Sequence, residues 1–200
     1  LSVQGILEAE VAAMAATLRH RGPDDNGIWA DAEAGVALGH RRLAIVDLSP
    51  AGRQPMQSAC GRFLLAFNGE IYNHLDLRRR LDSEARGAAW RGHSDTETLL
   101  AAFVAWGFTD TLKRCVGMFA LALWDRKERT LRLARDRIGE KPLYYGRVGE
   151  VFAFASELKA LRRISGFDNP IDRNALALFM QFGYVPAPQS IYRDISKLEP

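Results

Sequence analysis

The sequence predicts an α+β fold in which antiparallel sheets are covered by helices. Short apolar segments follow one another at distances that suit hairpins, and the helical patterns are grouped instead of alternating with single strands. That grouping argues against a doubly wound parallel sheet. The glycine-rich phosphate loops GxxxxGK[ST] and GxGxxG, and the nucleophile elbow GxSxG, do not occur.

The first third of the chain begins with a helix and continues with short strands. Apolar residues from Leu7 to Leu18 recur every three or four positions, and Gly22-Pro23 ends this helix. The predicted strands lie around residues 28–29, 36–38, 43–46 and 63–67. Asn68-Gly69 is the commonest dipeptide of tight turns, so a turn is predicted there, with a short return strand at 70–72.

The middle of the chain contains two capped helices, which are followed by a series of apolar strands. Asn73 is the predicted N-cap of a helix that continues to Leu81. Ser94 and Glu97 have the spacing of a capping box, and the helix that they open closes near Gly107. Residues 118–124 are almost wholly apolar, which predicts a strand buried on both faces. Residues 131–134 return as its partner, 143–145 and 151–155 form a further hairpin, and 156–161 form a short helix.

Composition excludes several classes of protein. The chain has 200 residues, 48% of them hydrophobic, and a net charge of +3, with no apolar stretch long enough to span a bilayer. The basic run Arg78, Arg79 and Arg80 is interpreted as a solvated helix face, because a nucleic-acid binder concentrates its positive charge on one face. A cytoplasmic protein that binds neither nucleic acid nor membrane is therefore expected.

The cysteines and histidines leave the function open by themselves. Cys60 and Cys115 are interpreted as a loop thiol and a core thiol, and the lack of a CxxC spacing predicts no metal site. The histidines are scattered through loops and element ends, which favours structural roles for each of them; they are His20, His40, His74 and His93.

Several motifs, in this order and spacing, together resemble one family. They are His20-Arg21-Gly22-Pro23-Asp24-Asp25, Gly39-His40-Arg41-Arg42-Leu43-Ala44-Ile45-Val46-Asp47, Phe67-Asn68-Gly69-Glu70-Ile71-Tyr72-Asn73, Ser94-Asp95-Thr96-Glu97, Gly117-Met118-Phe119-Ala120 and Ala134-Arg135-Asp136-Arg137-Ile138-Gly139-Glu140-Lys141-Pro142-Leu143-Tyr144-Tyr145. The chain is similar in these runs to the class II glutamine amidotransferase domain of asparagine synthetases. The resemblance covers essentially the whole chain.

The resemblance implies a fold, a reaction and a division of the chain. The fold is the four-layer αββα sandwich of antiparallel sheets found in N-terminal-nucleophile hydrolases. The reaction is hydrolysis of glutamine to glutamate and ammonia, which a synthetase domain uses for ATP-dependent amidation of a carboxylate such as that of aspartate. Residues 1–163 would form the amidotransferase domain, and 164–200, where glycine and proline surround one helix at 173–182, a linker and the start of the synthetase domain.

The same resemblance implies site residues. Arg42 would bind the glutamine carboxylate with its guanidinium fork, and Asp95 and Glu70 would accept from the ammonium. Asn68 and Gly69 would form the oxyanion hole, where the loss of one donor typically raises the barrier by about 3 kcal/mol. Leu43, Ile45 and Val46 would line the pocket. An alternative is that Arg42 and Asp95 are structural ion-pair residues and that Asn68-Gly69 is only a turn.

One departure from the family concerns the nucleophile. Members begin with a cysteine whose thiol attacks the amide and whose α-amine acts as base, whereas this chain begins Leu1-Ser2-Val3-Gln4. Cys60 and Cys115 lie outside the matching motif, so this chain alone is expected to be inactive. Either the sequence is a fragment of a longer enzyme, or the protein has become a non-catalytic glutamine-binding or scaffolding module.

Partners and cofactors follow from the same comparison. Glutamine is the expected ligand, and a synthetase domain of the same protein is the expected partner. ATP and magnesium are expected only in that second domain, and no cofactor is expected in this chain. A homodimer is possible, and the sequence leaves the acceptor of the ammonia open.

Overall fold

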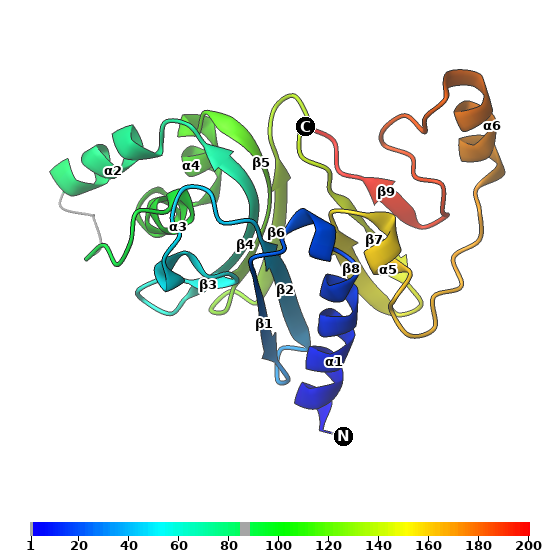
Figure 1. The fold of residues 1–200 in the computed structure, drawn as a ribbon, viewed down its shortest axis with the longest axis horizontal. Coiled ribbons are helices and arrows are strands. Elements are labelled where there is room, and N and C mark those ends of the chain that lie inside the picture. Colours follow the sequence, from blue (N-terminus) through cyan, green and yellow to red (C-terminus); the bar gives the residue numbers. More distant parts are fainter. Residues whose placement is uncertain (1, 85–88) are drawn as a thin grey trace.

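The computed structural model describes residues 2–84 and 89–200, and its fold is mixed α+β with antiparallel sheets (Figure 1). The strands of the described residues form sheets of two, four and three strands, ordered β1-β2, β3-β4-β5-β6 and β8-β7-β9. Their bounds are Asp25–Asp31 (β1), Val36–Arg42 (β2), Met56–Gln57 (β3), Phe63–Ile71 (β4), Gly117–Asp125 (β5), Thr130–Arg135 (β6), Tyr144–Val148 (β7), Val151–Ala155 (β8) and Ile195–Lys197 (β9).

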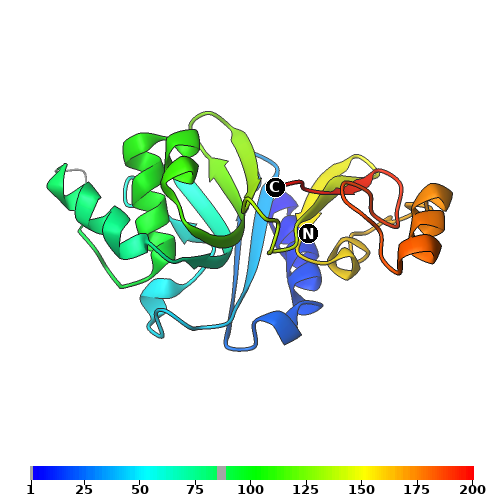
Figure 2. The same ribbon diagram turned by 90° about the horizontal axis from the view of Figure 1, so that it is seen from above.

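Helices α1, α3 and α5 pack directly on strands, α2 and α4 pack on α3, and α6 lies at one end of the molecule beyond the three-stranded sheet (Figures 1 and 2). Helices α2, α3 and α4 lie on one side of the four-stranded sheet, β1 and β2 lie on its other side, and α1 packs against β1, β2 and α5. Their bounds are Val3–Ala16 (α1), His74–Ser83 (α2), Asp95–Trp106 (α3), Phe108–Arg114 (α4), Leu158–Leu161 (α5) and Arg173–Phe182 (α6), with 3-10 turns η1 (Arg19–Arg21) and η2 (Pro50–Gly52). The second sheet layer is therefore divided between a hairpin and a separate three-stranded sheet.

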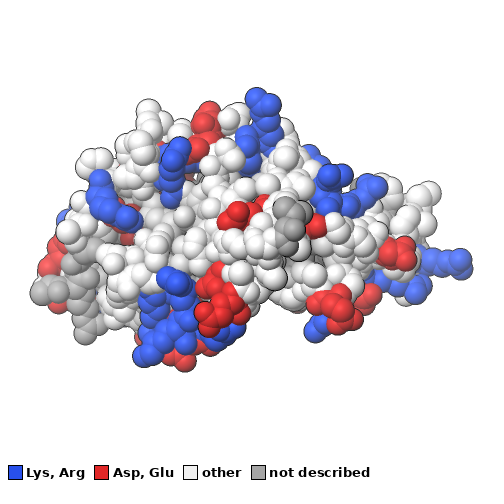
Figure 3. Space-filling model, turned by 90° about the horizontal axis from the view of Figure 1, so that it is seen from below, with Lys and Arg blue, Asp and Glu red and all other residues white. Residues whose placement is uncertain are grey.

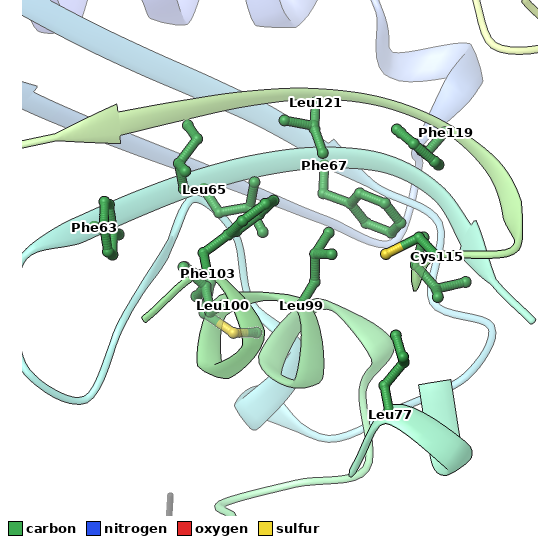
Figure 4. Close-up of a cluster of buried hydrophobic side chains, with 13 residues drawn as sticks. Phe63, Leu65, Phe67, Leu77, Leu99, Leu100, Phe103, Cys115, Phe119 and Leu121 are labelled. Carbon is green, nitrogen blue, oxygen red and sulfur yellow. The ribbon is translucent and has the colours of Figure 1, made fainter. Parts of the chain in front are cut away.

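The largest core lies between the four-stranded sheet and α3. Leu65 and Phe67 of β4 and Leu121 of β5 point toward Leu99 and Phe103 of α3, as Figure 4 shows. The whole of β4 pairs with β5, and β5 also pairs with β6, so β5 is a central strand. This confirms the prediction of a strand that is buried on both faces at residues 118–124.

Two local predictions near the end of β2 and in β4 are wrong. Residues 43–46 are not a strand, because β2 ends at Arg42 and the apolar side chains of Leu43 and Ile45 remain 54% and 69% exposed. Asn68-Gly69 is not a turn but part of β4, where Gly69 is opposite Phe119. A Cβ on Gly69 would lie 2.6 Å from the Phe119 Cα, so the glycine serves the close approach of two strands.

Both predicted helix caps are only partly right. Asn73 precedes α2, but its side chain bonds Arg114 O and Val116 N instead of capping the helix. Ser94 Oγ accepts the N–H of Glu97 at 3.2 Å, as the capping box requires. The Glu97 carboxylate, however, accepts from the backbone of the preceding loop and from Arg78.

The basic run on α2 is solvated only in part. The Arg78 side chain is 12% exposed and packs its guanidinium 4.0 Å from the centroid of the Trp90 ring. Arg79 and Arg80 are exposed and pair with Asp76 and Glu84 on their own helix. The interpretation of the run as a solvated face is therefore wrong for Arg78, whose position lies toward the loop before α3.

Three short elements were not predicted from the sequence. They are α4, β3 and β9. Strand β9 pairs with β7 in the register Tyr144–Lys197, so part of the tail after residue 164 belongs to the three-stranded sheet. Strands β3 and β9 have only two and three residues, which is too few for an alternating pattern to stand out.

The surface carries charges of both signs. On the face seen in Figure 3, basic and acidic side chains form several separate groups, and in some of these groups the two signs lie beside one another. In the described part of the chain, no helix has the length and apolar character needed to cross a bilayer.

Candidate functional site

A cavity of about 410 Å³ opens where the end of β2 approaches β4 and the start of α3. Its volume lies in the range of small-molecule sites, roughly 300–1,000 Å³. All eight residues that the resemblance implied for the site line this one cavity. They are Arg42, Leu43, Ile45, Val46, Asn68, Gly69, Glu70 and Asp95. Their grouping is a geometric fact, whereas their roles toward a ligand remain predictions.

Alternation along β2 brings its polar end to the cavity. Leu38, His40 and Arg42 are two residues apart and therefore share one face of the strand. Leu38 packs on Leu64 of β4, so this face is directed at the four-stranded sheet. His40 and Arg42 continue the same row beyond the apolar core and reach the cavity.

The edge of β4 at the cavity has no neighbouring strand. The odd-numbered residues of β4 direct their backbone N–H and C=O groups away from β5. Those of Phe63 bond Ser58, and those of Phe67 bond the side chains of other residues. Strand β3 pairs only as far as Leu65. Beyond that point, Gln54 Oε1 accepts from Phe67 N at 2.7 Å, His40 Nε2 donates to Phe67 O at 3.0 Å, and Asp95 Oδ2 accepts from Ile71 N at 2.9 Å.

Gly69 lies between these clamped positions. Since backbone directions alternate along a strand, its N–H points to the same edge as those of Phe67 and Ile71. The Asn68 side chain adds a second donor, because its Nδ2 is buried and has no hydrogen-bond partner in the described part of the chain. Buried amide groups are nearly always bonded, so an orphaned donor beside a cavity indicates a place for an acceptor.

Arg42 occupies the opposite side of the cavity and is 9% exposed. Its guanidinium donates to Ser49 O at 3.0 Å and to Asp47 O, so two of its five N–H groups hold the loop after β2. A Cβ on Gly52 would collide with the same guanidinium. No ion pair of Arg42 with a carboxylate is found among the residues the structure describes.

The two carboxylates of the cavity differ in their surroundings. Asp95 is 5% exposed, and burial raises the pKa of its carboxyl although Ile71 N and Thr96 N donate to it. A cation bound beside Asp95 would favour its ionised form. The Glu70 carboxylate has no hydrogen bond or ion pair with any residue in ranges 2–84 and 89–200.

Asp47 fixes the loop that forms one wall. Its carboxylate accepts from Ser49 N at 2.8 Å and from His93 N at 2.9 Å, which joins the loop after β2 to the loop before α3. The hydrogen bond from Ser49, followed by that from His93, lowers the pKa of Asp47 to about 2. The carboxylate is therefore ionised at neutral pH.

Sequence reasoning missed two residues that shape the cavity, His40 and Gln54. Both line it and both bond the backbone of Phe67. Extending the predicted strand at 36–38 by two residues would have placed His40 on the same face as Leu38. Gln54 lies in an irregular loop, and no pattern in the sequence marks it.

The two thiols lie away from the cavity. Cys60 is exposed and borders a separate hollow of about 360 Å³, and the Ser58 hydroxyl bonded to its sulfur lowers the pKa of the thiol. Cys115 is buried in the core beside α3, and burial raises the pKa of its thiol to about 12. Leu1, the first residue of the sequence, lies outside the described residues.

The polar groups of the described residues indicate which ligands the cavity can take. Among the described residues, no group of three or more histidine, cysteine, aspartate or glutamate side chains is arranged to hold a metal ion. Basic side chains, carboxylates and the donors of Asn68 and Gly69 line the cavity together, which suits a small zwitterion with a carbonyl group; the charged residues are Arg21, Arg41, Arg42, Lys141, Asp47, Glu70 and Asp95.

A family model described as a glutamine amidotransferase domain matches residues 2–200. The chain belongs to this family. Its relatives include asparagine synthetases of the glutamine-hydrolysing kind, and the domain is a class II amidotransferase of the N-terminal-nucleophile type. The resemblance drawn from the sequence motifs is thereby confirmed.

Three relatives show how much of each protein the domain represents. A putative asparagine synthetase of Mycobacterium bovis is 42% identical over 91% of this chain and 29% of its own length. A second, from Methanocaldococcus jannaschii, is 36% identical over 97% of this chain and 40% of its own. Asparagine synthetase 3 of Bacillus subtilis is 40% identical over 94% and 30%. The amidotransferase chain thus spans well under half the length of these relatives.

A solved structure supports the fold. Glutamine phosphoribosylpyrophosphate amidotransferase of B. subtilis, complexed with ADP and GMP, superposes with a TM-score of 0.64 over 82% of this chain and 42% of that one. The sequences are 23% identical over the match. This likeness concerns the fold alone.

Proposed function

We propose that this amidotransferase domain binds glutamine in the 410 Å³ cavity and polarises its side-chain amide for hydrolysis to glutamate and ammonia. The observation that carries the proposal is the orphaned Asn68 Nδ2 beside the Gly69 N–H on the unpaired edge of β4. Two converging donors are what a carbonyl oxygen needs when it becomes an oxyanion.

The ends of the ligand would be held by charge. The α-carboxylate of glutamine would bind the Arg42 guanidinium through N–H groups that the loop carbonyls leave available. The ammonium group would bind Asp95 and Glu70. Leu43, Ile45 and Val46 would cover the aliphatic part of the ligand with the loop after β2.

Hydrolysis requires a nucleophile at the amide carbon. A thiol that attacks this carbon forms a tetrahedral intermediate, ammonia leaves, and water releases glutamate from the thioester. Neither Cys60 nor Cys115 borders the cavity. The attacking thiol would therefore come from elsewhere in the longer protein, and the 200-residue chain would bind glutamine without hydrolysing it.

The longer protein would use the ammonia in a second domain. By analogy with relatives that carry the name asparagine synthetase, that domain would bind ATP and magnesium and amidate a carboxylate such as aspartate. Residues 1–163 would be the amidotransferase domain, and 164–200 would lead into the synthetase domain. Exposed apolar side chains on α6, among them Phe179 and Met180, support a covering partner for this tail.

A non-catalytic glutamine-binding module is the second candidate. It is favoured by the distance of both described thiols from the cavity. The two candidates share the binding step and differ only in ammonia release.

Calorimetry on the 200-residue chain tests the binding step. Glutamine should bind more tightly than L-2-aminopentanoate, which has the same α-carboxylate and ammonium but lacks the amide. Equal affinity for the two ligands, or no binding of either, would refute the proposed role of Asn68 and Gly69. Ammonia release by the longest protein that contains this chain then separates the enzyme from the binding module.

A further inference from the structure

The peptide unit before Asn68 is held in an unusual way. The carbonyl of Phe67 belongs to the same planar peptide as the N–H of Asn68, so its orientation sets the direction in which β4 enters the cavity. On the edge away from β5, no strand is available to bond this carbonyl, because β3 pairs only as far as Leu65.

Two side chains from different segments replace the missing strand partner. His40, in β2, donates from Nε2 to Phe67 O at 3.0 Å, and Gln54, in the loop before β3, accepts from Phe67 N at 2.7 Å. Both residues line the cavity. Together they satisfy both backbone groups of Phe67, which buried backbone groups require.

The state of the imidazole fits this task. Burial lowers the pKa of His40 to about 4; the hydrogen bond to Phe67 O and the charge of Asp25 act against this shift, and the Arg42 guanidinium acts with it. The ring is therefore neutral, and its proton lies on Nε2, because the carbonyl of Phe67 can only accept. Nδ1 is buried and has no partner in the described residues.

We propose that His40 is a positioning residue that, together with Gln54, holds the Phe67 peptide so that the Asn68 and Gly69 donors face the ligand carbonyl. The inference rests on the proposed glutamine site. It assigns to His40 no proton transfer and no contact with the ligand. A small misalignment of such donors weakens their hydrogen bonds strongly, because these depend steeply on distance and angle.

The test compares two ligands on variants of the full 200-residue chain. His40→Leu removes the donor to Phe67 O, whereas His40→Gln offers an amide N–H at a similar reach. We expect His40→Leu to weaken glutamine binding by roughly tenfold, on the scale of a lost well-aligned hydrogen bond. Binding of L-2-aminopentanoate should stay within about twofold, since it uses only the charged ends of the site.

A conservative variant and a spectroscopic measurement distinguish a positioning role of His40 from general distortion of the cavity. His40→Gln should restore most of the preference for glutamine. With glutamine labelled by ¹³C at the side-chain amide, the carbonyl resonance of the bound ligand should shift downfield in the wild type and in His40→Gln, and much less in His40→Leu. Gln54→Met provides an independent variant, with the same loss of preference, should His40→Leu fail to fold.

The outcomes are distinct. A wild-type chain that does not prefer glutamine overturns the proposed function itself. A wild-type preference that survives in folded His40→Leu and Gln54→Met overturns the positioning role alone. Equal weakening of both ligands, or a folded His40→Gln that restores nothing, also overturns it, because these results indicate general distortion of the cavity.

Discussion

The backbone N–H and C=O groups at the two edges of strand β4 are hydrogen-bonded in different ways. On one edge, all residues from Phe63 to Ile71 are in register with β5. On the other, strand pairing ends at Leu65, and side chains from β2, α3 and a loop bond Phe67 and Ile71. The first edge is a regular ladder, and the second forms one wall of the cavity.

The difference shows how a sheet can carry a binding site without losing its core. The ladder and the side chains beneath it supply stability, since Leu65, Phe67 and Leu121 pack on α3. The opposite edge leaves donors directed at the cavity, because side chains bond only some of its backbone groups. Changes on the core side of the strand should therefore affect folding, and changes at its open edge should affect ligand preference.

Leu65→Ala should have the largest effect on stability. The side chain is fully buried in the core between β4 and α3, so its truncation should lower the free energy of unfolding by about 4 kcal/mol. Urea denaturation measures this loss. In the remaining folded protein, the preference for glutamine over L-2-aminopentanoate should be unchanged, and a loss of preference would show that core and edge are not separable.

The pH dependence of stability should report His40. Its pKa is about 4 in the folded protein and 6.5 ordinarily, so the unfolded chain binds the proton first as pH falls. Stability that is present above pH 6.5 is then lost toward pH 4, by about 3 kcal/mol. His40→Gln should abolish this loss when unfolding is measured between these two pH values.

The pKa shifts of two carboxylates affect stability in a different pH range from His40 or in the opposite direction. Asp47, with its pKa lowered to about 2, contributes stability that is lost only below its usual value of 3.8, outside the main window of His40. Burial raises the pKa of Asp95, so its ionised form costs stability, and this cost is relieved as the pH falls. A wild-type protein no less stable at pH 4.5 than at pH 7 would contradict the role assigned to the buried imidazole.

Asn68→Ala should separate binding from stability most clearly. Removal of an unpartnered amide should change the free energy of unfolding by less than about 0.5 kcal/mol, because no hydrogen bond is lost. Glutamine binding should weaken by roughly tenfold. A stability loss above 2 kcal/mol in chemical denaturation, with unchanged ligand preference, would identify Asn68 as a structural residue of β4.

The thiols should give the smallest effect on ligand binding. Cys60→Ser should leave glutamine affinity unchanged within error, because Cys60 does not border the cavity. In the folded chain, a thiol reagent should label Cys60 rapidly and Cys115 only after unfolding, as their exposures and opposite pKa shifts require. Protection of Cys60 by glutamine would show that the thiol and the ligand are close.

Particular elements show what pattern could and could not predict. The strand at 118–124 was predictable because burial on both faces leaves a long apolar run. The strand prediction at 43–46 was wrong because the same kind of apolar run also occurs in a loop whose side chains line a cavity and stay exposed. The turn predicted at Asn68-Gly69 was wrong because a close strand partner, Phe119, requires glycine as strictly as a turn does.

By itself the sequence determined the family and the antiparallel α+β class, because motifs and apolar periodicity are local features of the chain, and the family resemblance identified eight of the residues that line the cavity. Tertiary structure alone decided how the site is held: that His40 and Gln54 meet at Phe67, that Asp95 bonds Ile71, and that both thiols lie elsewhere. The physical reason is that a strand edge without a neighbour takes its hydrogen bonds from whichever side chains folding brings to it, and those contacts join residues far apart in the chain.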